Sequence, residues 1–174
     1  MPVQRVAVVG NSGSGKSTLG RTLAATIGTD FIELDSIFHQ PGWQPLDADE
    51  FRRRVATIAA DDSWVIDGNY GAVRPLIWAR ADTIVWLDLP RGRVLRQIIW
   101  RTLRRLARRQ VLWNGNRERW RNFLSLDPQQ SVIAWSWRKH EDYRRRYGEA
   151  MNDPANGHLS FVRIRSRREL RALL

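Results

Sequence analysis

The eight residues from 10 to 17 read Gly-Asn-Ser-Gly-Ser-Gly-Lys-Ser, which is a complete phosphate-binding pattern. Its glycines let the backbone wrap closely around phosphate oxygens, and the N–H groups of such a loop point at negative charge. We expect Lys16 to place a positive charge near the outer phosphates and the Ser17 hydroxyl to ligate Mg²⁺. The residues predicted to bind a nucleotide are Gly10, Asn11, Ser12, Gly13, Ser14, Gly15, Lys16, Ser17 and Thr18.

The sequence on both sides of this pattern fits the context that a phosphate-binding loop requires. Residues 5–9 are a short run rich in β-branched side chains, which predicts a buried strand. Leu19, Leu23 and Ile27 recur at helical spacing, and Gly28 stands where the helix would end. A strand, a glycine-rich loop and a helix therefore follow one another, and this order separates a functional motif from a chance match.

Three carboxylates stand directly after apolar runs that read as strands: Asp35, Asp67 and Asp88. In open α/β sheets, ligands bind at the carboxyl ends of the strands. Asp67 is predicted to orient Mg²⁺ through water, and a turn-forming aspartate before Gly68 is the structural alternative. For Asp88, a structural and a functional role are equally open.

Strand and helix signals alternate along the whole chain, which predicts one α/β domain over residues 1–174 with a parallel sheet covered by helices. Asp47 and Glu50 are spaced as the cap of one helix, and Ser166 and Glu169 as the cap of the last. Two basic helices are expected near residues 91–109 and 131–147. The predicted strands are 5–9, 31–34, 64–66, 83–87 and 159–164.

One segment carries the entire excess of positive charge behind the net charge of +11. Residues 91–147 contain 16 basic and four acidic side chains, whereas the rest of the chain is almost neutral. Such a segment suits contacts to phosphate, either in a nucleotide or in a nucleic acid. Five of the nine tryptophans also lie there and are available to stack on bases. Both classes of partner are open at this point.

The composition excludes several other kinds of protein. The chain has no cysteine, which rules out disulfides and thiolate metal sites, and its three histidines do not have metal-ligand spacing. No apolar run approaches the roughly 20 residues of a membrane span. The first strand begins too early to leave room for a signal peptide. We therefore expect a cytoplasmic protein.

The layout resembles the nucleotide-kinase branch of P-loop proteins, which includes adenylate, shikimate and gluconate kinases. More narrowly, it is similar to the adenylate-kinase-related bacterial family called topology modulation protein. The resemblance covers essentially the whole chain. It implies the P-loop NTPase fold, with a five-stranded parallel sheet of order 2-3-1-4-5, an acceptor-binding insert at residues 36–63 and an arginine-rich lid at residues 91–147. Besides the loop, the motifs that carry it lie at residues 34–35, 41–43, 67–70, 87–90, 113–116 and 165–166.

The resemblance also implies roles for residues that would contact the phosphoryl acceptor. Shikimate kinases have an aspartate just after the second strand that contacts the acceptor hydroxyl, and Asp35 matches it; a helix cap or turn is the alternative. Adenylate kinases have an arginine after the third strand that grips an acceptor phosphate. Arg74 is the nearest match, but it stands seven residues after Asp67 instead of four. The predicted acceptor-binding residues are Asp35, His39, Trp43, Tyr70 and Arg74.

The remaining roles concern phosphoryl transfer and the nucleotide. Arg101 matches a lid arginine by its spacing from Asp88, while Gln97 stands where arginine is usual. Arg165 follows the fifth strand, where this fold usually covers the adenine. The predicted metal ligands are Ser17 and Asp67. The predicted catalytic residues are Lys16, Asp35, Asp67, Arg101 and Arg138, and further candidates for phosphate contacts are Arg117, Arg119, Arg145 and Arg146.

Together these residues predict a kinase that uses ATP and Mg²⁺ to phosphorylate a nucleoside, a nucleotide or a small metabolite. A hydroxyl acceptor is favoured over a phosphate acceptor, because Asp35 would repel an incoming phosphate. Arg74 and the arginines at 52–54 would offset that repulsion, which keeps a phosphate acceptor open. The alternative is an ATP-binding protein associated with nucleic acid. We expect a monomer or a homodimer without a membrane partner.

Overall fold

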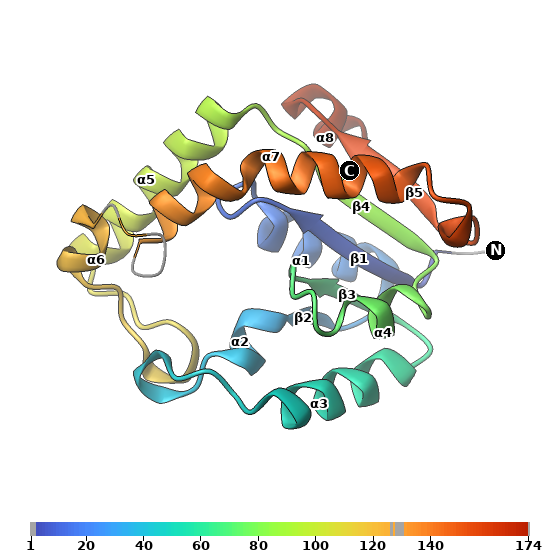
Figure 1. The fold of residues 1–174 in the computed structure, drawn as a ribbon, viewed down its shortest axis with the longest axis horizontal. Coiled ribbons are helices and arrows are strands. Elements are labelled where there is room, and N and C mark those ends of the chain that lie inside the picture. The colour runs from blue at the N-terminus through green and yellow to red at the C-terminus, as the bar shows by residue number, and fades with distance from the viewer. Residues whose placement is uncertain (1–2, 126, 128–130, 174) are drawn as a thin grey trace.

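The computed structural model describes residues 3–125, 127 and 131–173. Its centre is a sheet of five parallel strands in the order β2-β3-β1-β4-β5, which confirms the predicted fold class and strand order (Figure 1). In the register of the central strands, Val8 lies beside both Asp67 and Val85. The strands are β1 (Arg5–Gly10), β2 (Phe31–Glu33), β3 (Trp64–Asp67), β4 (Thr83–Leu87) and β5 (Ser160–Ile164).

The longer helices lie where the sequence predicts them. Asp47 caps its helix by accepting hydrogen bonds from the amides of Asp49 and Glu50, and Gly28 ends the first helix at a φ of 79°. The helices of five residues were not predicted, because so short a run shows little periodicity. The helices are α1 (Lys16–Ile27), α2 (Leu34–Phe38), α3 (Ala48–Ala60), α4 (Arg74–Trp78), α5 (Arg91–Ala107), α6 (Trp120–Leu124), α7 (Val132–Met151) and α8 (Arg167–Leu173).

Side chains of the central strands alternate between two buried clusters, because successive residues of a strand point to opposite faces. Ala7 and Val9 of β1 pack in one cluster with residues of α3 and α7. Val6 and Val8 pack in the other cluster with residues of α1. Since both faces are covered, the inner strands are apolar throughout and do not alternate between apolar and polar residues.

The chain just after the second strand differs from the prediction. β2 ends at Glu33, so Leu34 is not part of the strand, and Asp35 lies in the first turn of α2. The Ser36 hydroxyl donates to the Glu33 carbonyl at 2.7 Å, and the His39 amide donates to the Asp35 carbonyl at 3.0 Å. These local hydrogen bonds turn the backbone into a short helix at Leu34, where the strand was expected to continue.

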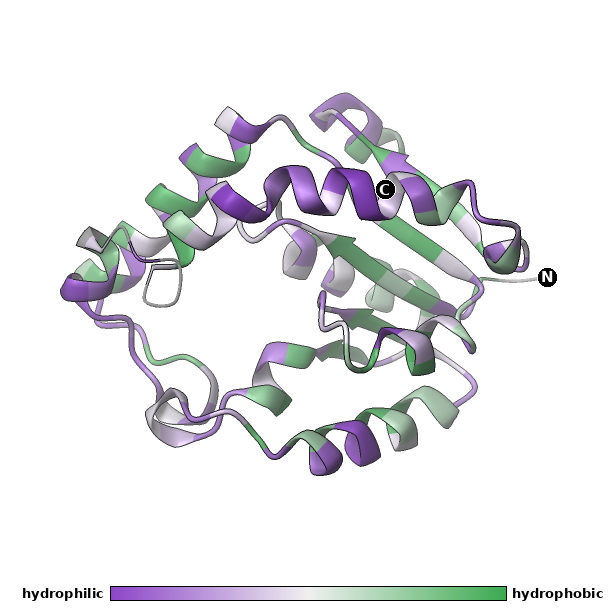
Figure 2. Cartoon of the chain, in the orientation of Figure 1, coloured by the Kyte–Doolittle hydropathy of each residue, from purple (hydrophilic) through white to green (hydrophobic). Residues whose placement is uncertain are grey.

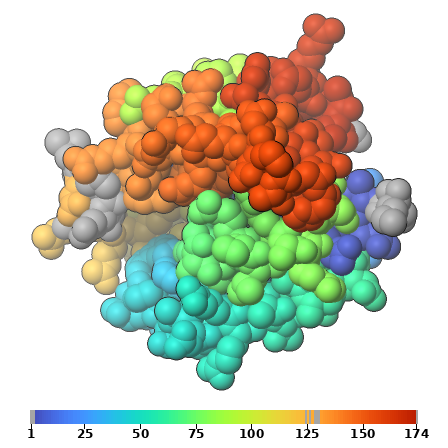
Figure 3. All heavy atoms as spheres, turned by 45° about the vertical axis from the view of Figure 1, so that its right-hand side comes forward, coloured from blue at the N-terminus to red at the C-terminus, as the bar shows by residue number. Residues whose placement is uncertain are grey.

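The carboxyl ends of the strands are flanked on one side by α5 and α7 and on the other by α2 and α3 (Figure 1). Hydrophobic residues gather on the strands, whereas hydrophilic residues colour much of α7 (Figure 2). In a turned view, atoms of α7 lie against those of the segment around α4 (Figure 3), and the rings of Trp78 and Tyr147 meet there. No helix in the described part of the chain is long and apolar enough to cross a membrane.

Candidate active site

The glycine-rich loop connects β1 to α1 and packs closely against α5. Gly13 has a φ of 81°, and a Cβ atom there would lie 2.7 Å from the Cβ of Ile98, so this position requires glycine. Lys16 folds back over the loop. Its Nζ donates to the Asn11 carbonyl at 3.2 Å and lies 3.8 Å from Asp67 Oδ1. The lysine charge is therefore held beside any phosphate that the loop would bind.

Ser17, Glu33 and Asp67 form a cluster of oxygen atoms beside Lys16. The Ser17 Oγ lies 2.7 Å from Glu33 Oε1 and also 2.7 Å from Asp67 Oδ2. Because a hydroxyl carries one proton, it can donate to only one carboxylate at a time. The contact between the hydroxyl and the other carboxylate is therefore favourable only if that carboxylate carries a proton or if a cation is bound beside it. Burial raises the pKa of Asp67, although Lys16 and Ser17 act against this shift, so burial favours a bound proton where no cation is present.

This oxygen cluster fits magnesium, which prefers oxygen ligands and keeps several waters when it is held by few protein groups. Ser17 and Asp67 are the predicted ligands. Glu33 was missed, although its place two residues before Asp35 at a strand end was a usable signal. Among the described residues, no group of three or more His, Cys, Asp or Glu side chains is placed to hold a metal ion. Phosphate and water oxygens would therefore complete the coordination.

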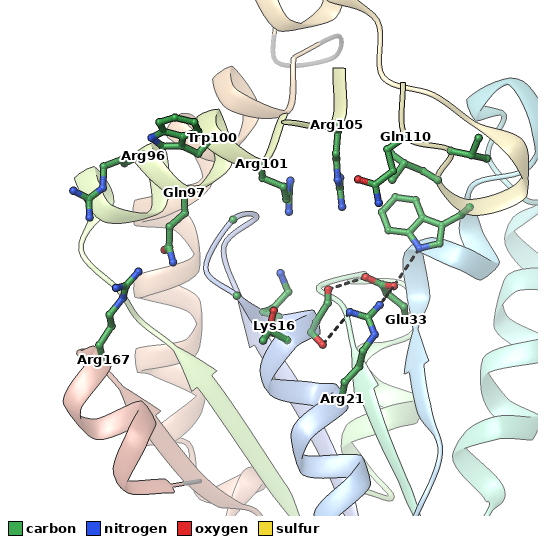
Figure 4. A pocket seen from close by; sticks show the side chains of 17 residues that line it. Lys16, Arg21, Glu33, Arg96, Gln97, Trp100, Arg101, Arg105, Gln110 and Arg167 are labelled. Atoms are coloured by element: carbon green, nitrogen blue, oxygen red, sulfur yellow. Dashed lines mark hydrogen bonds and ion pairs between the residues drawn. The ribbon is translucent and has the colours of Figure 1, made fainter. Parts of the chain in front are cut away.

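A cleft of about 800 Å³ lies between the glycine-rich loop and the basic segment, residues 91–147. This volume is in the range of small-molecule sites. Arg101 and Arg105 project from α5 toward Lys16 across the cleft (Figure 4). Gln97 Oε1 and Arg101 Nε are buried and have no hydrogen-bond partner among the described residues, as expected for groups that a bound nucleotide would contact. The other lining residues from this segment and α8 are Arg96, Trp100, Gln110, Val111, Leu112, Trp113 and Arg167.

Arg101 is the predicted lid arginine that the structure brings to the loop. Its Nη2 donates to the Ser12 hydroxyl at 3.3 Å. Burial, with Arg105 adding to the effect, lowers the pKa of Arg101 to about 10, so the side chain still carries its charge near neutral pH. Arg105 pairs with Glu118 at 3.0 Å. Opposite Lys16, the charge of Arg105 is therefore neutralised by Glu118, whereas Arg101 is available to phosphate.

Asp35 and Tyr70 meet at the edge of the site, although 35 positions separate them in the sequence. The Tyr70 hydroxyl donates to Asp35 Oδ1 at 2.6 Å. Burial, followed by the negative charge of Asp35, raises the pKa of Tyr70, so the phenol keeps its proton. Tyr70 therefore fixes the orientation of the Asp35 carboxylate, and the Oδ2 atom can accept from a second donor.

His39 and Trp43 lie in an aromatic group shared by the insert and the basic segment. The His39 ring stacks with Trp113 at a centroid distance of 6.0 Å and meets Trp43 edge-on at 5.2 Å. Burial lowers the pKa of His39, and the nearby Asp35 opposes this shift in part. Trp43 Nε1 donates to the Arg117 carbonyl at 3.1 Å. Both predicted acceptor residues therefore contact the basic segment directly.

Residues that were not predicted hold the glycine-rich loop in place. Asn69 pairs with Gly10 through both halves of its amide, and the Tyr147 hydroxyl donates to Asn69 Oδ1 at 2.8 Å. Asn11 Nδ2 donates to the Ser136 carbonyl at 2.8 Å and lies 3.4 Å from His140 Nδ1. The loop is thus tied to α7, which follows it by more than 100 residues; no local sequence pattern shows this.

Several predicted residues lie elsewhere. Arg138 is exposed on α7 and is not among the cleft-lining residues, and Arg165 is exposed while the cleft is lined by Arg167. Arg74 lies over the Trp78 ring at 5.9 Å. Asp88 is buried and paired with two arginines, Arg144 at 3.0 Å and Arg163 at 2.6 Å, which is a structural role. The remaining arginines suggested for phosphate contacts are outside the cleft lining: Arg52, Arg53, Arg54, Arg117, Arg119, Arg145 and Arg146.

Comparisons with known sequences point to one group of enzymes. The family model of shikimate kinase matches residues 12–44. Over 134 residues the chain is 25% identical to a shikimate kinase of Synechococcus elongatus, a match that covers 65% of this chain and 70% of that protein. Over 106 residues it is 28% identical to the chloroplastic shikimate kinase 2 of rice, Oryza sativa, and this match covers 52% of this chain and 34% of the rice protein.

Comparisons with solved structures agree on the fold. A shikimate kinase from Bacteroides thetaiotaomicron aligns with a TM-score of 0.55 at 14% identity and covers 98% of this chain and 94% of that one. A gluconokinase from Sinorhizobium meliloti 1021 aligns with a TM-score of 0.51 at 21% identity over 97% of this chain and 90% of its own. For a shikimate kinase from Acinetobacter baumannii in complex with shikimate, the TM-score is 0.53 at 17% identity, with 98% and 88% covered.

Proposed function

We propose that this chain, which is an ATP-dependent small-molecule kinase of the P-loop nucleotide-kinase-like type, transfers the γ-phosphoryl group of ATP to a hydroxyl group. The observation that carries this choice of acceptor is the pair formed by Asp35 and Tyr70. The phenol holds one carboxylate oxygen at 2.6 Å, so the other can accept the hydrogen bond of an acceptor hydroxyl. The negative charge of Asp35 also acts on Asp67 of the oxygen cluster, which lies 3.8 Å from Lys16.

The nucleotide would bind along the glycine-rich loop, with its triphosphate between Lys16 and Arg101. The loop amides, Lys16 and Arg101 hold and orient the phosphates and stabilise the charge that spreads over them in the transition state. Ser17, Asp67 and Glu33 would hold Mg²⁺. Neutralisation of part of the phosphate charge is the chemistry that Mg²⁺ would supply there. Arg105 and Arg167, which also line the cleft, are further candidates for contact with the nucleotide.

On the acceptor side, the role of Asp35 is to orient the hydroxyl and to take its proton as the new P–O bond forms and the bond between the γ-phosphorus and the oxygen of the leaving ADP breaks. Because Tyr70 donates to Asp35 Oδ1, the carboxylate cannot rotate freely, and the reacting oxygen is held in line. The Lys16 and Arg101 charges act on the phosphoryl group and leave the acceptor hydroxyl to Asp35. The reaction therefore uses two positive groups that flank the phosphates, Lys16 and Arg101, and one oriented carboxylate on the insert side.

The positions of the arginines support a hydroxyl acceptor over a phosphate acceptor. Arg74 packs on Trp78, and the arginines at 52–54 are exposed on α3, where Arg53 and Arg54 pair with Glu50. Among the described residues, none of these arginines forms an ion pair with Asp35, although Arg74 lines a small cavity together with Tyr70. A phosphate group would meet the negative charges of Asp35 and Glu33 without the cations that the phosphate-acceptor reading needs.

We further propose that residues 36–63 form the acceptor insert and residues 91–147 the lid of a single domain, and that the protein works in the cytoplasm as a monomer or a homodimer. The lid explains part of the positive charge, because Arg96, Arg101 and Arg105 line the cleft. The relatives named above are kinases, which gives no support to the alternative of a nucleic-acid-associated protein.

The test is a panel of acceptors with labelled ATP and Mg²⁺: shikimate, gluconate and related hydroxy acids, nucleosides, and nucleoside monophosphates. We expect a hydroxyl compound to be phosphorylated and Asp35→Asn to lower its turnover about 100-fold, the effect of losing a general base. Tyr70→Phe should have a smaller effect in the same direction, because the carboxylate remains. Phosphorylation of a nucleoside monophosphate that Asp35→Asn leaves intact would contradict the proposal.

A further inference from the structure

Two short turns from opposite sides of the cleft lie against each other. The first, Pro41–Trp43, belongs to the insert, and the second, Trp113–Gly115, is the tip of the lid. Each contains two consecutive residues of positive φ. In the insert turn one of them is Trp43, with a φ of 62°, and a bulky residue in this region is strained. A conformation of this kind persists only where surrounding contacts hold it.

The contacts that hold the insert come from two asparagines of the lid tip. Asn114 Nδ2 donates to the carbonyl oxygens of Ser36 at 3.1 Å and His39 at 2.5 Å. The buried Asn116 donates to the Gln40 carbonyl at 2.9 Å and accepts from the Trp43 amide at 2.9 Å. An amide offers both a donor and an acceptor, so Asn116 pairs with the insert backbone as another strand would.

A third contact of the lid tip reaches the oxygen cluster. The Trp113 indole Nε1 donates to Glu33 Oε2 at 3.2 Å, while Glu33 Oε1 lies 2.7 Å from the Ser17 hydroxyl (Figure 4). Arg21 also pairs with Glu33 Oε2, but its side chain is 60% exposed, so solvent screens this ion pair. The same turn that grips the insert therefore also orients the carboxylate beside Ser17.

We propose that residues 113–116 are a latch that joins the acceptor insert to the phosphate site, and that Trp113 is a positioning residue that acts through Glu33. Docking of the latch aligns Glu33 for the cation and fixes the insert that carries His39 and Trp43. When the latch undocks, Glu33 and the insert are released together, so closure over the acceptor and orientation of Glu33 toward the cation occur together. The catalytic consequence rests on the proposed function; the docking itself does not.

The first experiment measures docking without turnover. Because the chain has no cysteine, two introduced cysteines can carry spin labels without further changes. We place them at Ala56 on α3 and Arg119 in the lid, both exposed, and measure their separation by double electron–electron resonance.

Asn116→Asp turns the amide donor into an oxygen that repels the Gln40 carbonyl, and it should move most of the population to longer distances. Asn122→Asp adds the same charge to the lid away from the insert and should leave the distances unchanged. A distribution for Asn116→Asp that matches the wild type would overturn the latch.

The second experiment tests Trp113. Trp113→Phe keeps the ring against His39 but removes the N–H that Glu33 accepts, and Trp120→Phe is the matched control at an exposed lid tryptophan. The measurement is the affinity of the protein–ATP-analogue complex for Mn²⁺, followed by electron paramagnetic resonance. A lost hydrogen bond to a charged group predicts a loss of about tenfold for Trp113→Phe, with unchanged label distances. Equal affinities in the two variants would refute the positioning role.

The two proposals fail in different ways. If no acceptor hydroxyl is phosphorylated by the wild type, the proposed reaction is wrong, while the distance and Mn²⁺ results still decide the latch. If an acceptor is phosphorylated, Asn116→Asp should lower kcat by about tenfold or more together with the loss of docking. Full turnover in an undocked variant would show that the latch has no part in the reaction.

Discussion

The nucleotide wall of the site is one continuous stretch of chain, residues 10–18, whereas in the acceptor wall Asp35 meets Tyr70, 35 positions away, and Glu33 meets Trp113, 80 positions away. The first wall is made of backbone amides and one lysine, which any chain with this local sequence and a following helix can present. The second wall depends on side chains that meet only when insert, sheet and lid are packed. Substitutions in the nucleotide wall should remove phosphate binding, while substitutions in the acceptor wall should alter the orientation of the side chains that meet there.

Lys16→Ala should have the largest effect, because it removes the positive charge of the nucleotide wall. We expect turnover to fall about 1000-fold and ATP affinity to fall as well, since Lys16 would contact phosphate in both the ground and transition states. Labelled-ATP turnover and calorimetry with an ATP analogue would measure the two effects. Activity close to the wild type in this variant would show that the cleft is not the transfer site.

Asp67→Asn should come next, because this residue lies where the two walls join. Its carboxylate is replaced by an amide of the same size beside Ser17 and Lys16, so the loop should keep its shape. We expect kcat to fall about 100-fold with a much smaller change in nucleotide affinity, the pattern of a group that acts mainly in the transition state. Asp88→Asn is the contrasting variant: it should lower stability, because Arg144 and Arg163 lose their shared partner. Comparable losses of affinity and kcat for Asp67→Asn would instead mark it as a binding residue.

Tyr147→Phe tests how far the nucleotide wall depends on distant packing. The change removes the hydroxyl that donates to Asn69 Oδ1, while the Asn69 amide keeps its bonds to Gly10. We expect the free energy of unfolding to fall by about 1 kcal/mol, the worth of one hydrogen bond. Urea unfolding measures the loss, and KM for ATP should rise only slightly. A change in KM without a change in stability would point to a direct role in binding.

The smallest expected effect is a pH dependence of stability at His140. Burial lowers the pKa of His140 below its usual 6.5, with Arg144 and Arg91 acting in the same direction and Glu141 and Asp88 against it. A group with a lowered pKa in the folded state takes up a proton more readily when unfolded, so stability should be lost as pH falls below about 6.5. His140→Gln should reduce this slope in urea unfolding between pH 7 and pH 5. An unchanged slope in His140→Gln would mean that another buried group causes the pH dependence of stability, and His39 would be the next candidate.

Much of the fold followed from the sequence, since it depends on signals that are local. The apolar runs, the caps at Asp47 and Ser166 and the stop at Gly28 each act within a few residues. Asp67 was predicted from its place at a strand end, and it lies 3.8 Å from Lys16. The role of Asp35 was implied by the resemblance and stays a prediction. Arg138 was predicted from its place on the second basic helix and Arg165 from the resemblance. Both are exposed and outside the cleft lining, because the packing of helices and loops decides which side chains face the cleft.

What the sequence by itself determined is a P-loop and its flanking strand and helix, because the required conformations and charges all belong to neighbouring residues. The tertiary structure decided that Glu33 joins Ser17 and Asp67, that Tyr70 orients Asp35, and that two lid asparagines hold the insert. These contacts join residues that are 16 to 78 positions apart. Their geometry depends on helix phase and sheet register, and these are fixed only when the whole core packs.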